Sequence, residues 1–571
     1  MKRKAIVAVL TAILPAAALA QLSTPDASRR GPTITIDGAN IIEPRTMAVA
    51  GFKREETSIL PEIKTVRVGE TGFDLVCTYR NTKTSPQPLA RLTIGALALG
   101  PEVQYLNVHR GSTIIDTTHK SYISQAWRYP SEAFSPVSVL MNKEVAVGVS
   151  LLYPVTEYKH DVLVGVSRAG GVFHGPAGAE GWTVSFDLSQ PPYNNPNTAL
   201  PYPASLKPGE ERTYTVAVRT LKRTKLPRSV TDQQDWLETL LPYREHFQKQ
   251  FGPVSYTRTP DAVLACEVAN VSAIRSDNPR GFLGDKSTRP DLNGFGSFIN
   301  YIRAKEGFRR VMLWAPSGLY DKHREHNYPT QFTAGWDEVP LLRTTSQHLN
   351  TLPRTGTQLG LWWGRFTQHA DTWNPETLEP LDIENREHLR SITKQLALAH
   401  KAGSTLIGLD GLNHWLVPVW DQIRLIRAMR RIYPSITFVA EPMCADFIQV
   451  DAPGFMIAYQ ARKDARSDRD FHKLKTPHYL ADFLIPGHET WGYFRYSEIQ
   501  RVRPGNISAA RVQSDADALA KLGYVPVIVS TVPLSDPDRA MAAKTWQTTV
   551  PKHLQQKPDQ NSEQSVFRES R

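Results

Sequence analysis

The chain has 571 residues and a mass of 64.0 kDa, which at roughly 100–200 residues per domain indicates more than one domain. Hydrophobic residues make up 41% and charged residues 22% of it, so wholesale disorder and collagen-like order are excluded. The formal net charge of +11 is scattered and interleaved with acids, which favours a solvated basic surface and no nucleic-acid partner.

The first 20 residues have the pattern of an export signal. Lys2, Arg3 and Lys4 are basic, residues 5–16 are apolar, and Ala18-Leu19-Ala20 fits a small-x-small cleavage site. The apolar stretch is shorter than the roughly 20 residues of a membrane anchor. We therefore expect cleavage near Ala20, an exported protein in the periplasm or outside the cell, and no membrane span after cleavage.

Residues 31–220 predict an antiparallel β-sandwich, because short β-rich runs alternate with Gly, Pro, Asn and Asp turns. The clearest runs are 33–36, 73–79, 92–94, 145–149 and 213–218. Residues 221–260 differ, since Trp236, Leu237, Leu240 and Leu241 follow a possible cap at Asp232 with helical spacing. This segment predicts a helical connector between two domains.

Residues 261–534 predict a (β/α)8 barrel, because short apolar runs alternate with amphipathic helices. The expected strands are 262–265, 310–314, 358–363, 405–410, 437–441, 455–459, 479–485 and 525–529. One of the helices has Asn385 as its cap and Gly403 as its stop signal. Residues 551–571, rich in Gln, Lys, Ser and Glu, predict a disordered tail.

The active site of such a barrel lies at the carboxyl ends of the strands. The residues that end the expected strands include two acids and several aromatics: Trp314, Trp362, Trp363, Asp410, Glu441 and Tyr459. Sugar chemistry uses both kinds of residue, because a glycosidic bond is broken by a pair of carboxyl groups and aromatic rings pack against the C–H face of a sugar. Asp410 and Glu441 end consecutive strands, which lie about 4.8 Å apart, near the carboxyl separation of retaining glycosidases.

We assign Asp410, which is flanked by Gly408 and Gly411, as nucleophile or stabiliser of the cationic centre, with His414 as a hydrogen-bond donor beside it. Glu441 follows an apolar run, which suits a general acid. Other residues expected at the same mouth are Arg365, Trp415, His488 and Trp491, together with Trp336, Trp373 and His369.

The arrangement resembles secreted glycoside hydrolases of the α-amylase and α-galactosidase superfamilies, in which a β-sandwich accompanies a (β/α)8 barrel. An Asp on the fourth strand, a Glu on the fifth and the Asp-x-x-x-His spacing of Asp410 and His414 match the α-amylase pattern. The resemblance implies an α-linked saccharide substrate, Asp410 as nucleophile and Glu441 as acid/base. It departs at Gly408, where the superfamily has Arg.

Several alternatives remain open at this stage. Glu489, in the loop expected after the seventh strand, is a rival acid to Glu441, and Asp482 is a further candidate for a third acid. The motif 323–326, with two His residues beside Asp321, is read as a solvated loop, so we expect no metal and no cofactor. The alternative function is a non-catalytic carbohydrate-binding protein with the same cleft, and a third is a metal-dependent enzyme that modifies polysaccharides.

Overall fold

The structure is a computed structural model of the chain. It describes residues 33–35, 59–70, 72–97, 99, 102–109, 111–116, 124–154, 158, 160–168, 182–190, 205–223, 234–259, 261–267, 308–314, 316, 332–333, 336–337, 343, 345–364, 366–371, 374–410, 419–441, 445–458, 478–494 and 509–530. The expected leader (1–20), the expected tail (551–571) and the motif 323–326 lie outside these residues.

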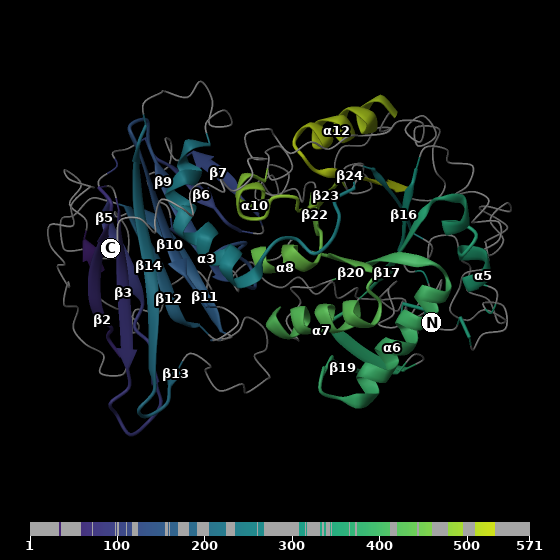
Figure 1. Ribbon diagram of the computed structural model, residues 1–571, viewed down its shortest axis with the longest axis horizontal. Helices are drawn as coiled ribbons and strands as arrows, with labels where there is room; N and C mark the ends of the chain where they lie inside the picture. Colours follow the sequence, from purple (N-terminus) through teal and green to yellow (C-terminus); the bar gives the residue numbers. More distant parts are fainter. Residues whose placement is uncertain are drawn as a thin grey trace, which may run out of the picture.

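Two sheets form the N-terminal region (Figure 1). The five-stranded sheet has the order β1 (Thr33–Thr35), β5 (Leu92–Leu97), β12 (Trp182–Gln190), β11 (Asp161–Arg168) and β8 (Ser124–Tyr129). The seven-stranded sheet has the order β2 (Glu62–Val68), β3 (Gly72–Arg80), β14 (Glu211–Lys222), β10 (Val145–Leu152), β9 (Val137–Met141), β6 (Gln104–Asn107) and β7 (Thr113–Asp116). The short strands β4 (Gln87–Pro88) and β13 (Ser205–Leu206) pair separately.

The sheets are antiparallel apart from the β1–β5 pair. Strand β3 shows why they pack, because Phe73, Leu75, Cys77 and Tyr79 are buried at every second position, as a half-buried strand requires. These side chains join one apolar core with those of the other sheet, such as Phe186.

The connector begins with the 3-10 helix η3 (Asp235–Leu240) and continues as α3 (Leu241–Phe251). Pro242 starts α3, where a missing backbone N–H costs no hydrogen bond. Gly148 of β10 lets η3 approach closely, because a Cβ at that position would overlap Thr239. Figure 1 shows α3 between the N-terminal sheets on the left and the barrel on the right.

Eight parallel strands close into a barrel, as β15 pairs with both β16 and β24. The strands are β15 (Val263–Glu267), β16 (Arg310–Trp314), β17 (Gln358–Trp363), β20 (Ser404–Leu409), β21 (Thr437–Ala440), β22 (Gly454–Ala458), β23 (Thr490–Phe494) and β24 (Val525–Ser530). The predicted fold class, antiparallel sheets followed by a (β/α)8 barrel, is therefore confirmed.

Among the described residues of this region, the helices are α5 (Thr345–Leu349), η6 (Pro353–Thr355), α6 (Arg386–Lys401), α7 (Val419–Ile432), α8 (Asp446–Asp451), α10 (Tyr479–Leu484) and α12 (Ala509–Lys521). The predicted cap of α6 is confirmed, since the Asn385 side chain accepts a hydrogen bond from the backbone N–H of Glu387 at 2.9 Å. Gly403 follows α6 with φ of 78°, a conformation that glycine adopts without strain. Among the helices in the described ranges, none is long and apolar enough to cross a membrane.

The prediction for the seventh strand is wrong. Residues 479–484 form the buried helix α10, and the seventh barrel strand is β23, which begins at Thr490. A short apolar run does not distinguish a buried helix from a buried strand. The aromatic side chains of β23 are the better strand signal, because Trp491 and Tyr493 alternate with Gly492 and both face the barrel interior.

Candidate active site

Side chains at alternate positions of the barrel strands point inward and form an apolar cluster of their own. They are Val263, Ala265, Met312, Trp362, Leu406, Val439, Phe455, Trp491, Tyr493, Val525 and Val527, with Trp314 packed against them. Because alternation along a strand has a period of two residues, this cluster also indicates which residues just beyond each strand end face the interior.

Asp410 and Glu441 directly follow β20 and β21, the fourth and fifth strands of the barrel. The backbone N–H of Asp410 donates to the carbonyl of Trp363 at 3.0 Å, and that of Glu441 donates to the carbonyl of Leu409 at 3.1 Å. Each residue therefore extends the parallel ladder by one step. Since Leu409 is the register partner of Ala440, Asp410 and Glu441 are neighbours in that ladder.

The inward direction of both acids follows from the residues that precede them. Leu406 and Val439 belong to the interior cluster, and Asp410 and Glu441 stand four and two positions further along the same strands. Both side chains thus leave the backbone on the interior side, at the carboxyl ends of the strands. Glu441 is buried and Asp410 is half-buried.

Four of the aromatic rings in the barrel interior pack against one another. Trp314 is 6.0 Å from Trp362 and 5.5 Å from Tyr493, measured between ring centroids, and Phe455 is 5.2 Å from Trp362. Trp314 ends β16 and is half-buried, and its indole N–H is enclosed with no hydrogen-bond partner in the described part of the chain. An unpaired buried donor at the carboxyl end of a barrel strand is suited to donate a hydrogen bond to a hydroxyl group of a ligand. Phe455 and Tyr493 were missed in the sequence, although the alternation in β23 could have indicated Tyr493.

Gly408 gives Trp362 the room that it occupies. The two residues are register partners on β20 and β17, and a Cβ at Gly408 would overlap the Trp362 ring. The indole therefore fills the space that a longer side chain at position 408 would need.

The prediction that Trp363 binds substrate is wrong. It is buried on the outside of the barrel, where its ring stacks on Phe332 at 5.2 Å and meets Phe366 edge-on. Consecutive residues of a strand point to opposite faces, so only Trp362 of the pair faces the interior. Trp336 is buried as well, and its indole N–H donates to the carbonyl of Pro316 at 3.3 Å.

Glu489 lies at the opposite end of the barrel from Asp410, so the rival acid pair is wrong. Glu489 precedes β23, and its carboxylate accepts a hydrogen bond at 2.7 Å from Arg310, the first residue of β16. Both side chains are almost completely buried. The Trp491 indole N–H also donates to Glu489, and the Arg310 guanidinium lies 4.8 Å from the Trp491 ring centre. These three residues close the amino end of the barrel. The prediction that Trp491 contacts substrate is therefore also wrong.

His488 and Asp482 belong to the same end of the barrel. The His488 ring is buried, with Nε2 3.6 Å from an Asp482 carboxylate oxygen. Burial lowers the pKa of His488 to about 3 and raises the pKa of Asp482 to about 7. Neither residue is near the acids at the carboxyl ends, so both predictions are wrong. The misassigned strand at 479–485 explains the error, because residues 486–492 then appeared to follow a strand.

The remaining predicted contacts, Arg365, His414, Trp415 and Tyr459, together with Trp373, lie outside the described residues.

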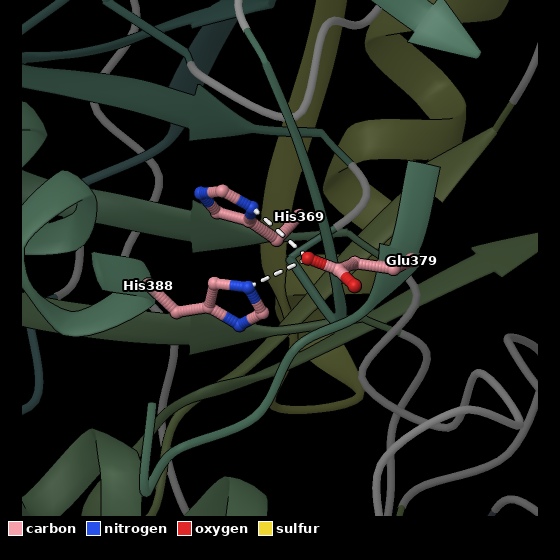
Figure 2. Close-up of side chains that lie close together, drawn as sticks. All are labelled: His369, Glu379 and His388. Carbon is pink, nitrogen blue, oxygen red and sulfur yellow. Dashed lines mark hydrogen bonds and ion pairs between the residues drawn. The ribbon is translucent and has the colours of Figure 1, made fainter. Parts of the chain in front are cut away.

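A histidine cluster stands on the loop between β17 and α6, where β18 (Gln368–Asp371) and β19 (Asn374–Pro380) form a hairpin. His369 and Glu379 are cross-strand partners, and the His369 and His388 rings stack with centroids 4.0 Å apart. Figure 2 shows both rings turned toward the Glu379 carboxylate, which is 2.8 Å from His388 Nε2 and 3.9 Å from His369 Nδ1. The sequence suggested His369 but not its two partners.

These three residues lie close enough to hold a metal ion, as their ligand atoms are within 4.8 Å of one another. The hydrogen bonds of His388 oppose that use. Its Nδ1 accepts a hydrogen bond from the backbone N–H of Asp382 at 3.0 Å, which assigns the ring proton to Nε2, facing Glu379. A histidine that binds metal through Nε2 donates from Nδ1 instead. His388 and Glu379 are therefore joined by a hydrogen bond, and His369 stacks on His388.

No known protein family matches the chain, and no curated protein sequence matches it. Among solved structures, the α-amylase of Geobacillus thermoleovorans in complex with acarbose is 13% identical, over 52% of this chain and 77% of that chain, with a TM-score of 0.34. A β-arabinopyranosidase is 9% identical over 66% and 50%, with a TM-score of 0.33. The glycoside hydrolase domain of PelA from Pseudomonas aeruginosa is 16% identical over 40% and 88%, with a TM-score of 0.24. At these TM-scores no functional conclusion follows from the likeness.

Proposed function

We propose that this chain is an exported glycoside hydrolase that cleaves an α-linked saccharide with retention of configuration. One observation carries the proposal: Asp410 and Glu441 extend neighbouring parallel strands by one residue each, on the inward side of the barrel. Backbones paired in this way lie about 4.8 Å apart, which is close to the separation of roughly 5–5.5 Å between the two carboxyl groups of retaining glycosidases.

The proposed reaction has two steps. In the first, Glu441 gives its proton to the glycosidic oxygen while Asp410 attacks the anomeric carbon, so that the leaving alcohol departs and a glycosyl ester forms on Asp410. In the second, the Glu441 carboxylate takes a proton from water, the hydroxide attacks the anomeric carbon, and the ester bond to Asp410 breaks. Both residues return to their starting protonation states.

The aromatic rings support a sugar as the substrate. Trp314 is half-buried beside Trp362 and has an indole N–H with no partner among the described residues. A sugar offers both the C–H surface that packs on such rings and the hydroxyl oxygens that accept from such a donor. The α linkage rests on the resemblance of the Asp410 and Glu441 positions to the α-amylase superfamily, and export rests on residues 1–20.

The test is hydrolysis of a panel of aryl glycosides by the parent, Asp410→Asn and Glu441→Gln. We expect at least one substrate to be cleaved, and each substitution to lower kcat by about 10²–10⁴-fold while sugar binding persists by calorimetry. The control is Glu384→Gln, an exposed carboxylate whose partner in the described ranges is Arg424, and it should keep the parent activity.

A parent that binds saccharides but cleaves none of the panel would instead identify a non-catalytic carbohydrate-binding protein. Activity that survives both acid substitutions would contradict the assignment of the acids.

A further inference from the structure

Asp446 is a completely buried carboxylate at the start of α8, five residues after Glu441. Hydroxyl groups of Ser135 and Tyr243 donate to its Oδ2 at 2.6 Å each, and the Tyr129 hydroxyl donates to its Oδ1 at 2.9 Å. The backbone N–H of Phe447 donates to Oδ1 at 2.8 Å. Both carboxylate oxygens are thus used, and three of the four donors come from outside the barrel.

These donors belong to the parts of the chain that pack against the barrel. Tyr129 is the last residue of β8, Ser135 stands between β8 and β9, and Tyr243 belongs to α3. The backbone is held as well, because the N–H of Asp446 donates to the carbonyl of Phe134 at 2.8 Å. Residue 446 is therefore the point at which the N-terminal sheets and the connector together bind the start of α8.

No cationic side chain pairs with Asp446 among the described residues. Burial raises the pKa of Asp446 to about 6, and the hydrogen bonds from Ser135, Tyr243 and Tyr129 act in the opposite direction. Burial also raises the pKa values of Tyr129 and Tyr243 well above their usual value, so both remain neutral donors. Burial of a carboxylate without a counter-ion costs free energy unless several hydrogen-bond donors satisfy it. Loss of any one of these donors should therefore weaken the hold on Asp446.

The far end of α8 is held separately. Asp451 pairs with Arg427 at 2.8 Å and Arg430 at 3.3 Å, both on α7, and the hydroxyl of Tyr256 donates to the carbonyl of Gln449 at 2.9 Å. At the other end of this segment, Glu441 is bound to β20 through its backbone N–H. Among these contacts, those of Asp446 are the ones that fix the start of α8.

We propose that Asp446 is a positioning residue, through which the N-terminal sheets and α3 hold the start of α8 and thereby set the place of Glu441, five residues earlier in the chain. The role of Glu441 in this statement rests on the proposed function, whereas the attachment of α8 does not. The N-terminal sheets would then contribute to the geometry of the active site, although their hydrogen bonds to Asp446 lie on the outside of the barrel.

The test uses the full chain with Asp446→Asn, Tyr243→Phe and Ser135→Ala, each of which alters or removes hydrogen bonds at this carboxylate with little change of volume. The control is Ser138→Ala, because the buried Ser138 hydroxyl has no partner within the described ranges. We expect hydrogen–deuterium exchange of residues 437–451 to rise in the three variants and stay at the parent level in the control. With a cleaved aryl glycoside, kcat should fall between about ten- and a hundred-fold in Asp446→Asn, as small misplacements of a catalytic group do, while KM changes less than about threefold.

Exchange of residues 437–451 at the parent level in Asp446→Asn and Tyr243→Phe would overturn the proposal, as would a kcat equal to that of Ser138→Ala. If Asp446→Asn does not fold, Ser135→Ala and Tyr243→Phe decide the question, because each removes a single hydroxyl. If the parent cleaves no glycoside, the proposed function fails, and the exchange measurement still decides whether Asp446 holds the start of α8.

Discussion

At the scale of single residues, the two ends of the barrel interior have different chemistry. The carboxyl end has Asp410 and Glu441 above aromatic rings, whereas the amino end is closed by the buried pair of Arg310 and Glu489. Glu489 has a partner for each oxygen, since Arg310 donates to Oε1 and the backbone N–H of Thr259 donates to Oε2 at 2.8 Å. These surroundings are those of a carboxylate that stabilises the fold.

Glu489→Gln should therefore destabilise the fold and leave the chemistry intact. Removal of one charge from a buried ion pair typically costs about 3–5 kcal/mol, because the other charge stays buried without a counter-ion. We expect a loss of that size in the free energy of unfolding, measured by urea denaturation, with kcat unchanged for the folded protein. A catalytic Glu489 would give the opposite result, a collapse of kcat at nearly constant stability.

A second residue-scale prediction concerns pH. Burial lowers the pKa of His160, in the N-terminal sheets, from 6.5 to about 4, and its Nε2 lies 3.1 Å from the hydroxyl of Tyr214. As the pH falls from 6.5 to 4, the unfolded chain gains a proton at His160 that the folded chain does not take up. The free energy of unfolding should then decrease by roughly 3 kcal/mol through this group, and stability is lost toward acid.

His160→Gln isolates this contribution from buried acids such as Asp446, whose raised pKa acts in the opposite direction. Urea denaturation at pH 7 and pH 4 should show a smaller acid loss in the variant than in the parent. An equal loss in both proteins would show that the folded chain protonates His160 at the same pH as the unfolded chain, which would contradict the lowered pKa.

At the scale of elements, most barrel strands were predictable because they are nearly continuous apolar runs, as at 358–363 and 404–409, and α6 because Asn385 and Gly403 mark its ends. The exception is the segment 479–485, which was predicted as a strand. Residues 479–484 are as apolar as a strand, yet they form α10. A buried apolar run of six or seven residues fits either structure. The position of Glu489 depended on that single assignment.

The contact between β17 and β20 gives a prediction at this scale. Gly408→Ala would place a methyl group against the Trp362 ring, and such overpacking typically costs about 1–3 kcal/mol. We expect that loss in urea denaturation, with weaker saccharide binding because Trp362 must move. The double variant with Trp362→Phe should recover part of the stability, since the smaller ring leaves room. Strictly additive effects of the two substitutions would contradict the packing argument.

At the scale of the whole molecule, the sequence indicated two domains and a connector but not how they meet. Tyr129 and Asp446 are 317 residues apart in the chain, and Ser135 and Asp446 are 311 apart. No local pattern pairs residues at such a separation, because the pairing depends on how the sheets, α3 and α8 pack together. Asp446 was not singled out from the sequence.

The pair of carboxylates Asp410 and Glu441, in contrast, could be predicted from the sequence. Asp410 and Glu441 are 31 residues apart, but each ends a strand of a regular barrel, and the regularity of that fold makes their neighbourhood predictable from the sequence. The aromatic rings were only partly predictable, since the inward side of each strand is set by the register of the closed barrel. Trp362 and Trp363 could be separated only in that context.

The most direct test of the central claim is a search for a covalent sugar on Asp410. The chain and its Glu441→Gln variant are exposed to a panel of activated fluorosugars, which form a glycosyl ester quickly and release it slowly, and the peptides are then analysed by mass spectrometry. We predict one added sugar, attached to Asp410, and none in Asp410→Asn. A label on any other carboxylate, or glycoside hydrolysis by Asp410→Asn at the parent rate, would contradict the account.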